Sequence, residues 1–286
     1  MIKIDTLKFT KELLKTNDIR AKKSYGQNFL IDDDVLKEIV KLSDINENDL
    51  VIEIGPGLGN LTYYLQNSNL LLIEIDDRML EILQDRFGSN ENITIINNDV
   101  LKLNIDEEID KIEKAKNVKF NKIKVVANLP YYITSPIIFK LLEDSTKVSE
   151  IVVMVQEEVA DRIIAKSKSK DYGILTLMIQ YYARATKEIV VPGSSFIPSP
   201  NVTSAIIKII KEEKYMDVDS KIFKELVHKS FANRRKKVIN SLVINKLLDL
   251  EKEAIDKILK KCNISENARA EELDIDKYIE VVKQLM

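Results

Sequence analysis

The chain has 286 residues, 45% of them hydrophobic, which is enough for one large domain and a smaller one. Its 44 Lys and Arg nearly balance 46 Asp and Glu, and the formal net charge of -2 excludes a uniformly basic nucleic-acid-binding protein. A surface for RNA or DNA must therefore be a local patch. One cysteine, Cys262, and one histidine, His228, exclude an internal disulfide and a cysteine-rich or histidine-rich metal site.

Residues 1–17 lack the apolar core of a signal peptide, and no apolar run approaches the ~18 residues that a membrane helix needs. The sequence therefore predicts a cytoplasmic protein that binds no metal ion and does not associate with a membrane.

The first segments are predicted to be helical, with a basic loop between them. Apolar spacing predicts a short helix over residues 6–15, and acidic N-cap candidates precede an amphipathic helix over residues 35–42. The loop over residues 20–30 carries Lys22 and Lys23, which either contact phosphate or are simply solvated. The residues themselves favour neither interpretation.

From residue 50, short apolar runs alternate with helix-like stretches. Each run is nearly continuous in Val, Ile and Leu, as expected for strands that are covered on both faces. The runs span residues 50–54, 70–75, 93–97, 123–127, 151–155, 186–191 and 202–210. The repeated strand-helix-strand order predicts an α/β protein with a Rossmann-like, doubly wound, mostly parallel sheet of seven strands.

A small all-helical domain is predicted after residue 211, where the strand runs stop. A 3.6-residue period covers residues 220–232, 235–248, 251–261 and 274–285. The charged stretch 106–121 is expected to be a solvated helix or an excursion between strands. The predicted domains are residues 1–211 and 212–286.

The most specific motif is a glycine loop in which Gly55, Gly57 and Gly59 follow the first strand of the sheet directly. Glycines at these positions let the backbone turn sharply against a ligand before a helix begins. Glu74 ends the next strand about 20 positions later, the spacing of a carboxylate that accepts ribose hydroxyls in nucleotide-binding folds. Asp99 follows the third strand and suits the amine of an adenine.

Two cofactors compete for this loop. A nicotinamide dinucleotide favours the spacing Gly-x-Gly-x-x-Gly, with its pyrophosphate at the helix N-terminus. This chain has Gly-x-Gly-x-Gly preceded by Glu53, whose carboxylate would repel a diphosphate. S-adenosylmethionine carries an ammonium and a sulfonium but no phosphate, so the acid-flanked loop favours it.

A second motif, Asn128-Leu129-Pro130-Tyr131, lies at the carboxyl end of the predicted strand 123–127, where open α/β sheets bind ligands. It offers an amide, a free backbone carbonyl, a stiffening proline and an aromatic face, which together can hold a planar ring that bears an amine. An ordinary turn before a helix would contain the same residues, so the motif alone leaves both interpretations open.

Taken together and in order, these motifs resemble those of the ribosomal RNA adenine dimethyltransferases, and within them the bacterial small-subunit branch. The resemblance runs from residue 25 to residue 279. It is carried by residues 26–30, the loop 53–62, Glu74, Asp99 and residues 128–131, 196–200, 231–236 and 269–273.

The resemblance implies a set of residues that bind S-adenosylmethionine: Asn28, Leu30, Gly55, Gly57, Glu74, Asp99 and Asn128. It also implies the substrate, a pair of adjacent adenines in the 3′-terminal hairpin of small-subunit rRNA, each methylated twice at N6. The partner is then the immature small subunit. A methylase of large-subunit rRNA and a protein that acts mainly as a ribosome-assembly factor remain alternatives.

The expected catalytic residues are those of the second motif together with Phe196. Asn128 Oδ1 and the Leu129 carbonyl would each accept one N6–H bond of the adenine, and Pro130 would keep both acceptors in place. Tyr131 would stack on one face of the base, with Phe196 as the candidate for the other face.

A local basic patch lies between residues 229 and 237, with five cations and no acid: Lys229, Arg234, Arg235, Lys236 and Lys237. We expect Arg234, Arg235 and Lys236 to contact RNA phosphate, with Lys22 and Lys23 as a second candidate patch. A solvated helix start would show the same run of charge. The protein is expected to be a monomer.

Overall fold

The chain divides into two units, which are described here one at a time. The computed structural model describes residues 5–19 and 27–286. A sheet unit comprises residues 1–160 and 186–211, and a helical unit comprises residues 161–185 and 212–286. The sequence predicts a boundary near residue 211, and the structure also breaks there. It differs in assigning residues 161–185 to the helical unit, because Tyr181 stacks on Phe223 with ring centroids 4.3 Å apart.

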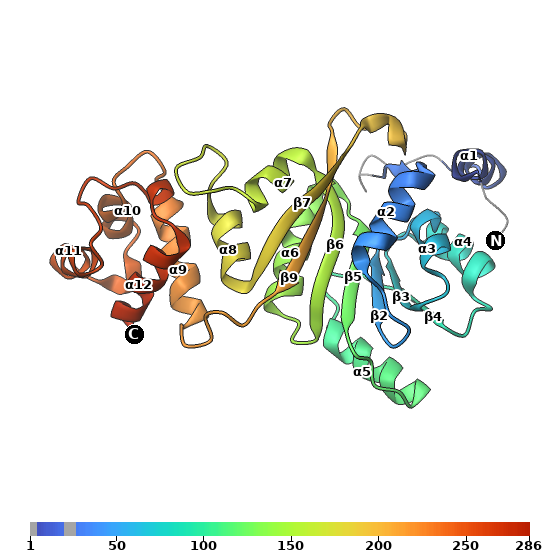
Figure 1. Cartoon of the computed structure of the whole chain (residues 1–286), viewed down its shortest axis with the longest axis horizontal. Coiled ribbons are helices and arrows are strands. Elements are labelled where there is room, and N and C mark those ends of the chain that lie inside the picture. The colour runs from blue at the N-terminus through green and yellow to red at the C-terminus, as the bar shows by residue number, and fades with distance from the viewer. Residues whose placement is uncertain (1–4, 20–26) are drawn as a thin grey trace. The chain divides into compact units, whose positions relative to one another are not determined.

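The sheet unit contains the mostly parallel seven-stranded sheet that the sequence predicts. Its order is β4-β3-β2-β5-β6-β9-β7 (Figure 1). The strands are β2 (Leu50–Ile54), β3 (Asn69–Glu74), β4 (Ile93–Asn97), β5 (Ile123–Asn128), β6 (Val148–Gln156), β7 (Ala183–Val191) and β9 (Ser204–Lys211). Neighbouring strands from β4 to β6 pair in parallel, and β9 is antiparallel to β6. The winding direction reverses between β2 and β5, the point at which such sheets bind ligands.

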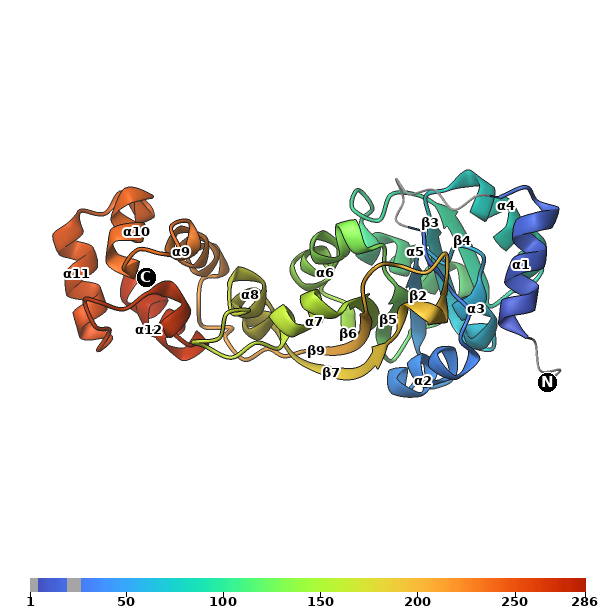
Figure 2. The ribbon, with the colours of Figure 1, turned by 90° about the horizontal axis from the view of Figure 1, so that it is seen from above.

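Helices cover both faces of this sheet, with α2 and α3 on one face and α6 on the other (Figure 2). The helices are α1 (Thr6–Thr16), α2 (Asp33–Ser43), α3 (Asn60–Leu65), α4 (Asp77–Phe87), α5 (Ile105–Lys116) and α6 (Thr134–Glu143), and α7 (Glu157–Ile163) begins at the end of β6. Asp5, Asp32 and Asp76 cap α1, α2 and α4 by accepting backbone N–H bonds of the first turn. The charged stretch expected between two strands forms α5.

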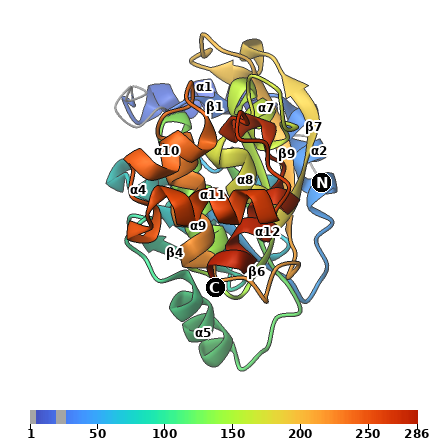
Figure 3. The same ribbon diagram turned by 90° about the vertical axis from the view of Figure 1, so that its left-hand side faces the viewer.

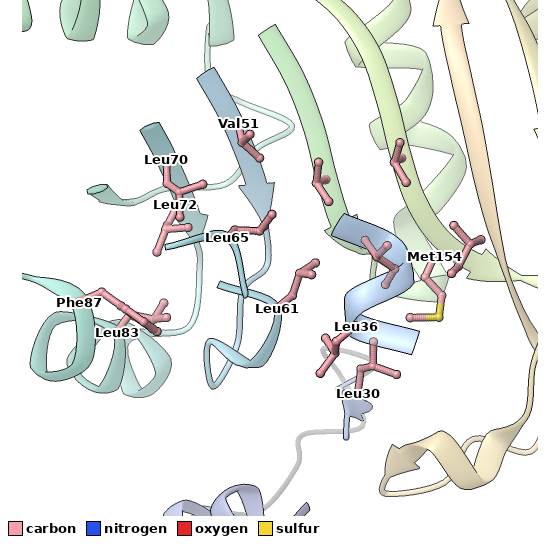
Figure 4. Packing of buried hydrophobic residues seen from close by; sticks show 14 of the residues in the cluster. Leu30, Leu36, Val51, Leu61, Leu65, Leu70, Leu72, Leu83, Phe87 and Met154 are labelled. Carbon is pink, nitrogen blue, oxygen red and sulfur yellow. The ribbon is translucent and has the colours of Figure 1, made fainter. Parts of the chain in front are cut away.

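The core of the sheet unit lies between the strands and the helices that cover them. Figure 4 shows Leu36 of α2, Leu61 and Leu65 of α3, and Val51 and Leu72 of the sheet within one cluster. Each of these side chains is buried. Burial of such a side chain stabilises the fold by about 1.5–3 kcal/mol. The strand ends that carry the polar motifs are therefore held in place by a packed core.

The helical unit is built from five helices and two single 3-10 turns. They are α8 (Ile174–Tyr182), α9 (Ser220–Phe231), α10 (Val238–Ile244), α11 (Lys252–Lys261) and α12 (Ile275–Leu285), with turns at Leu247–Asp249 and Ala270–Glu272 (Figure 3). The helix expected over 235–248 is shorter than predicted, because Lys237 forms an isolated antiparallel bridge with Arg269 and its backbone is not helical. Among the described residues, no helix is long and apolar enough to cross a membrane.

A buried ion pair ties α2 to the sheet below the strand ends. Lys124 Nζ of β5 lies 3.2 Å from Asp49 Oδ2, and both side chains are 2% exposed. The same ammonium donates to the backbone carbonyls of Ser43 and Asp44 at the end of α2. One cation therefore neutralises a buried carboxylate and donates to two backbone carbonyls at the end of α2.

We predict that Lys124→Met lowers the free energy of unfolding by about 3–5 kcal/mol, because it removes the counter-ion of the buried Asp49 carboxylate and the donor to the buried Ser43 carbonyl. Urea unfolding followed by circular dichroism measures this loss. Lys122→Met serves as the control, since Lys122 pairs with Glu150 but is 50% exposed, and it should cost less than about 1 kcal/mol. Equal losses in the two variants would contradict the role given to Lys124.

Candidate active site

A cavity of about 260 Å³ lies at the carboxyl ends of β2, β3 and β5. The polar side chains that line it include Asn28, Glu53, Asn60, Glu74, Asp99 and Asn128. Among the described residues of the lining there are three carboxylates and no Lys, Arg or His. The cavity therefore favours a ligand that carries positive charge and several hydrogen-bond donors.

The glycine loop forms one wall of the cavity and requires glycine for steric reasons. Gly57 and Gly59 have φ angles of 56° and 77°, in the left-handed region that side chains rarely adopt. A Cβ on Gly57 would lie 3.2 Å from the Phe29 ring, and one on Gly59 would lie 2.6 Å from the Phe87 ring. The loop can therefore follow its tight path only because these side chains are absent.

Glu74 is held rigidly at the end of β3. Its Oε2 accepts the Gly57 N–H at 3.0 Å, and its Oε1 accepts the N–H groups of Ile75 and Asp76, both at 2.9 Å. Burial raises the pKa of this carboxyl, and the three backbone donors act in the opposite direction. With both oxygens fixed in the lining, the carboxylate suits a pair of ribose hydroxyls, as the sequence predicts.

Glu53, in the middle of the same wall, is deeply buried at 2% exposure. Burial raises its pKa to about 8, and the neighbouring Glu74 adds to the rise. A hydrogen bond of 2.6 Å from the Thr62 hydroxyl and the charge of Arg86 partly oppose it. The carboxyl of Glu53 is thus neutral over much of the physiological range, and a cation bound in the cavity would favour its charged form.

Asp99 lies after β4 on the opposite side of the cavity. Its Oδ1 accepts the Leu101 N–H at 3.0 Å, and its side chain is 28% exposed. The carboxylate thus remains accessible as an acceptor beside the buried Val100. This placement suits the edge of an adenine ring.

Asn128 ends β5, and its side-chain orientation is set by a residue far away in the sequence. Its Nδ2 donates to the Asn28 carbonyl at 3.0 Å. The Oδ1 atom has no hydrogen bond to any described residue and lies in the wall of the cavity. Because a carbonyl can only accept, this contact determines which end of the amide is the donor and keeps Oδ1 available.

The next three residues continue the wall. The Leu129 N–H donates to the Met154 carbonyl at 3.2 Å, while its own carbonyl has no partner within residues 5–19 and 27–286. Pro130 packs near the glycine loop, since a Cβ on Gly55 would lie 3.9 Å from its ring. The Tyr131 hydroxyl is hydrogen-bonded to Ser204 Oγ at 2.5 Å, which anchors the ring to the start of β9.

Leu30 and Phe196 differ in position although their strands pair. Leu30 in β1 (Phe29–Leu30) is opposite Phe196 in β8 (Phe196–Ile197). Leu30 lines the cavity, as expected of a cofactor-binding residue. Phe196 is 2% exposed and belongs to the core cluster of the sheet unit, and it is not part of the lining. The alternation of side chains along β8 turns its ring into the core, so the structure does not bring it to the expected stacking position.

Asn60 lines the cavity and was not singled out from the sequence. It is 6% exposed, and its Nδ2 donates to Thr10 Oγ1 at 2.9 Å and to the Leu30 carbonyl at 2.8 Å. Its Oδ1 is buried and has no partner among the described residues. A buried acceptor without a partner costs about 1–3 kcal/mol. A lone Asn at a helix start carries no sequence signal for this role.

Of the expected RNA-binding residues, those that the structure describes do not line this cavity. Lys22 and Lys23 lie outside the described residues. Arg234, Arg235 and Lys236 lie in the helical unit and are exposed.

The cavity fits S-adenosylmethionine better than it fits a dinucleotide. A diphosphate would have to lie against Glu53 and Glu74 with no cation of the described lining to neutralise it. An ammonium and a sulfonium are instead complementary to these acids.

Known proteins resemble this chain over nearly its whole length. A family model described as "Ribosomal RNA adenine dimethylase" matches residues 19–286. "Ribosomal RNA small subunit methyltransferase A" of Bacillus cytotoxicus is 43% identical over 94% of this chain and 92% of its own. The protein of the same name from Shouchella clausii is 44% identical over 92% and 89%, respectively. The crystal structure of a dimethyladenosine transferase from Plasmodium falciparum is 26% identical and superimposes with a TM-score of 0.76 over 90% of this chain and 97% of that one.

We predict that Glu53→Gln changes the pH dependence of stability. Because the pKa of Glu53 is about 8 in the folded protein and 4.5 ordinarily, its stabilising contribution is complete below pH 4.5 and is lost as the pH rises through 8. Relative to the variant, the wild-type protein should lose up to about 1.4 kcal/mol per pH unit within that interval. Urea unfolding at several pH values measures the difference.

The exposed Glu81→Gln provides the matched control, with the same chemical change at the surface. Parallel pH profiles for wild-type protein and Glu53→Gln would show that Glu53 does not titrate differently in the folded state.

Proposed function

The chain belongs to the ribosomal RNA adenine dimethylase family, and we propose that the cavity at its strand ends is where two adjacent adenines of the 3′-terminal rRNA hairpin are methylated. The protein is an S-adenosylmethionine-dependent adenine N6,N6-dimethyltransferase of small-subunit rRNA. The observation that carries the assignment of the site is the pair of free acceptors at the end of β5, Asn128 Oδ1 and the Leu129 carbonyl.

These two acceptors address the chemical difficulty of the reaction. The N6 lone pair of adenine is delocalised into the ring, so the amine is a weak nucleophile. Hydrogen bonds from its two N–H groups to Asn128 and Leu129 favour a more tetrahedral nitrogen, whose lone pair then points away from both acceptors. The Asn28 carbonyl and the Met154 carbonyl hold the two residues in place before the substrate arrives, which lowers the cost of reorganisation.

Bound S-adenosylmethionine supplies an electrophilic methyl group. We propose that Glu74 holds its ribose, Asp99 its adenine amine, and Glu53 with Asn60 its positively charged end. Gly55 and Gly57 let the backbone approach it, and Asn28 and Leu30 close the cavity from the side of β1. The low exposure of Glu53, Asn60 and Glu74 supports these roles, because charge complementarity is strongest where water is excluded.

Tyr131 would hold the substrate base by stacking. Its hydrogen bond to Ser204 fixes the orientation of the ring, and stacking on an aromatic ring is worth ~1–3 kcal/mol per base. The buried position of Phe196 speaks against a second stacking face there. After the first transfer one N–H remains, so one of the two acceptors at Asn128 and Leu129 is released before the second transfer.

For the whole protein we propose an immature small ribosomal subunit as the partner, a role in subunit biogenesis, action as a monomer, and a cytoplasmic location. The names of the two curated relatives support the small subunit over the large one. Exposed cations in the helical unit support contact with rRNA phosphate.

We predict that Asn128→Ala lowers the single-turnover rate of dimethylation roughly 100-fold, because one preorganised hydrogen bond to the reacting amine is lost. The assay uses undermethylated small subunits with enzyme in excess and maps methyladenines by mass spectrometry. Cofactor affinity, measured by calorimetry, should fall only modestly. Asn98→Ala removes another amide from the lining and should keep its rate. A near-normal rate for Asn128→Ala would exclude the proposed role.

We predict that Tyr131→Phe and Ser204→Ala are both mild, with losses within about 10-fold, since each keeps the aromatic face and removes only its anchor. Tyr131→Ala should reduce the rate severely because the stacking face is gone. The same single-turnover assay measures all three. If Tyr131→Phe were as damaging as Tyr131→Ala, the hydroxyl rather than the ring would be the working group.

A further inference from the structure

Three segments of the helical unit that are distant in sequence lie against one another. They are residues 166–170 between α7 and α8, residues 234–237 before α10, and residues 269–271 before α12. Lys168 N donates to the Glu271 carbonyl at 2.7 Å, which joins the first segment to the third. Lys237 and Arg269 form an antiparallel bridge, which joins the second to the third. We call the face that they build the three-segment surface.

Arg234 links all three segments and is therefore engaged within the protein. Its Nε donates to Glu271 Oε2 at 2.8 Å, and its Nη2 donates to the Lys170 carbonyl at 2.7 Å. The sequence suggests a phosphate contact for this residue. One of its donors instead bonds to the loop 166–170 and another bonds to Glu271, so the Arg234 side chain holds these segments together.

The cations of the three-segment surface are exposed and numerous. They are Lys166, Lys168, Lys170, Arg235, Lys236, Lys237 and Arg269. None of them forms an ion pair with a described residue, whereas the acid at the centre, Glu271, is neutralised by Arg234. The three segments of a protein with a formal charge of -2 overall thus carry seven exposed cations outside any ion pair with a described residue, with Asp171 and Glu272 as the adjoining acids.

Lys168, in the loop 166–170, has a backbone conformation that is unfavourable in free energy. Its φ is 71°, in the left-handed region where glycine would be less strained by ~1 kcal/mol. The bond from its N–H to the Glu271 carbonyl maintains this conformation. The chain therefore carries a cation at a position where backbone energy alone favours glycine.

We propose that the three-segment surface binds the phosphate backbone of RNA, with Lys166, Lys168 and Lys170 as phosphate contacts and Arg234 as a positioning residue that holds their loop. This inference rests on the proposed function, which supplies RNA as the polyanion. It extends the phosphate-binding set beyond the basic run at 234–237 that is visible in the sequence. Phosphate contacts of this kind position an RNA without reading its bases.

The first test compares two triple variants of the full chain with the same loss of charge. One is Lys166→Ser with Lys168→Ser and Lys170→Ser. The control is Lys252→Ser with Lys257→Ser and Lys261→Ser, which removes three exposed lysines from α11 of the same unit. The probe is a transcript of the 3′-terminal hairpin of small-subunit rRNA, and its dissociation constant is measured across a KCl series.

We expect the loop variant to weaken binding at low salt and to reduce the slope of log K against log salt concentration by about 2–3, close to one per lost phosphate contact. The control should keep the wild-type slope. Equal slopes for the two triple variants, or a wild-type slope for the loop variant, would overturn the proposal. An unchanged cofactor dissociation constant in each variant shows that the sheet unit is folded.

The second test measures how Glu271→Ala changes RNA affinity. A pure charge effect and the positioning of the loop predict changes of opposite sign in this affinity. Removing an acid from a cationic surface should strengthen RNA binding if only charge matters. We expect a weaker dissociation constant instead, by about 3-fold or more, together with faster trypsin cleavage after Lys168, because the loop is released. Stronger binding, or unchanged cleavage, would overturn the positioning role.

The outcome is separable from that of the proposed function. Methyl transfer by the wild-type protein tests the function, whereas the salt slope and the cleavage rate test the surface. A protein that transfers no methyl group but shows the expected salt slopes would support the RNA-binding surface and contradict the proposed reaction.

Discussion

The structure depends on the parallel register of β2, β3, β4 and β5, which places the carboxyl ends of these strands at one edge. The glycine loop, Glu74, Asp99 and Asn128 each follow a different strand, and only this register brings them to one cavity. Because β2, β3 and β5 are buried over most of their length, their ends cannot shift without breaking a packed core. A rigid sheet edge of this kind suits a reaction that needs a weak nucleophile held at a fixed place.

Electrostatics within the cavity are as selective as its shape. Three carboxylates line a space in which the described lining has no cation. Burial raises the pKa of both Glu53 and Glu74, that of Glu53 to about 8. A positively charged ligand favours the charged form of both acids, whereas a diphosphate would disfavour it.

Acidic and basic side chains are also distributed unequally between the two units. The sheet unit carries acids around its cavity, while the helical unit carries cations on the three-segment surface. In the whole chain, the 44 Lys and Arg nearly balance the 46 Asp and Glu. The net charge of the chain excludes only a uniformly basic RNA-binding protein. The distribution of charge supports one, because phosphate binding depends on local cation density rather than on the total.

The sequence by itself determined the sheet, the glycine loop and the acids after β3 and β4, because continuous apolar runs and turn-forming glycines are local signals. It also indicated Asn128 and Tyr131, whose place follows from the end of β5. Only the tertiary structure decided how Asn128 is oriented, since its partner Asn28 lies 100 residues away. The burial of Phe196, the free oxygen of Asn60 and the clamp formed by Arg234 likewise arise from contacts between distant segments, and neither periodicity nor spacing encodes which side chains meet there.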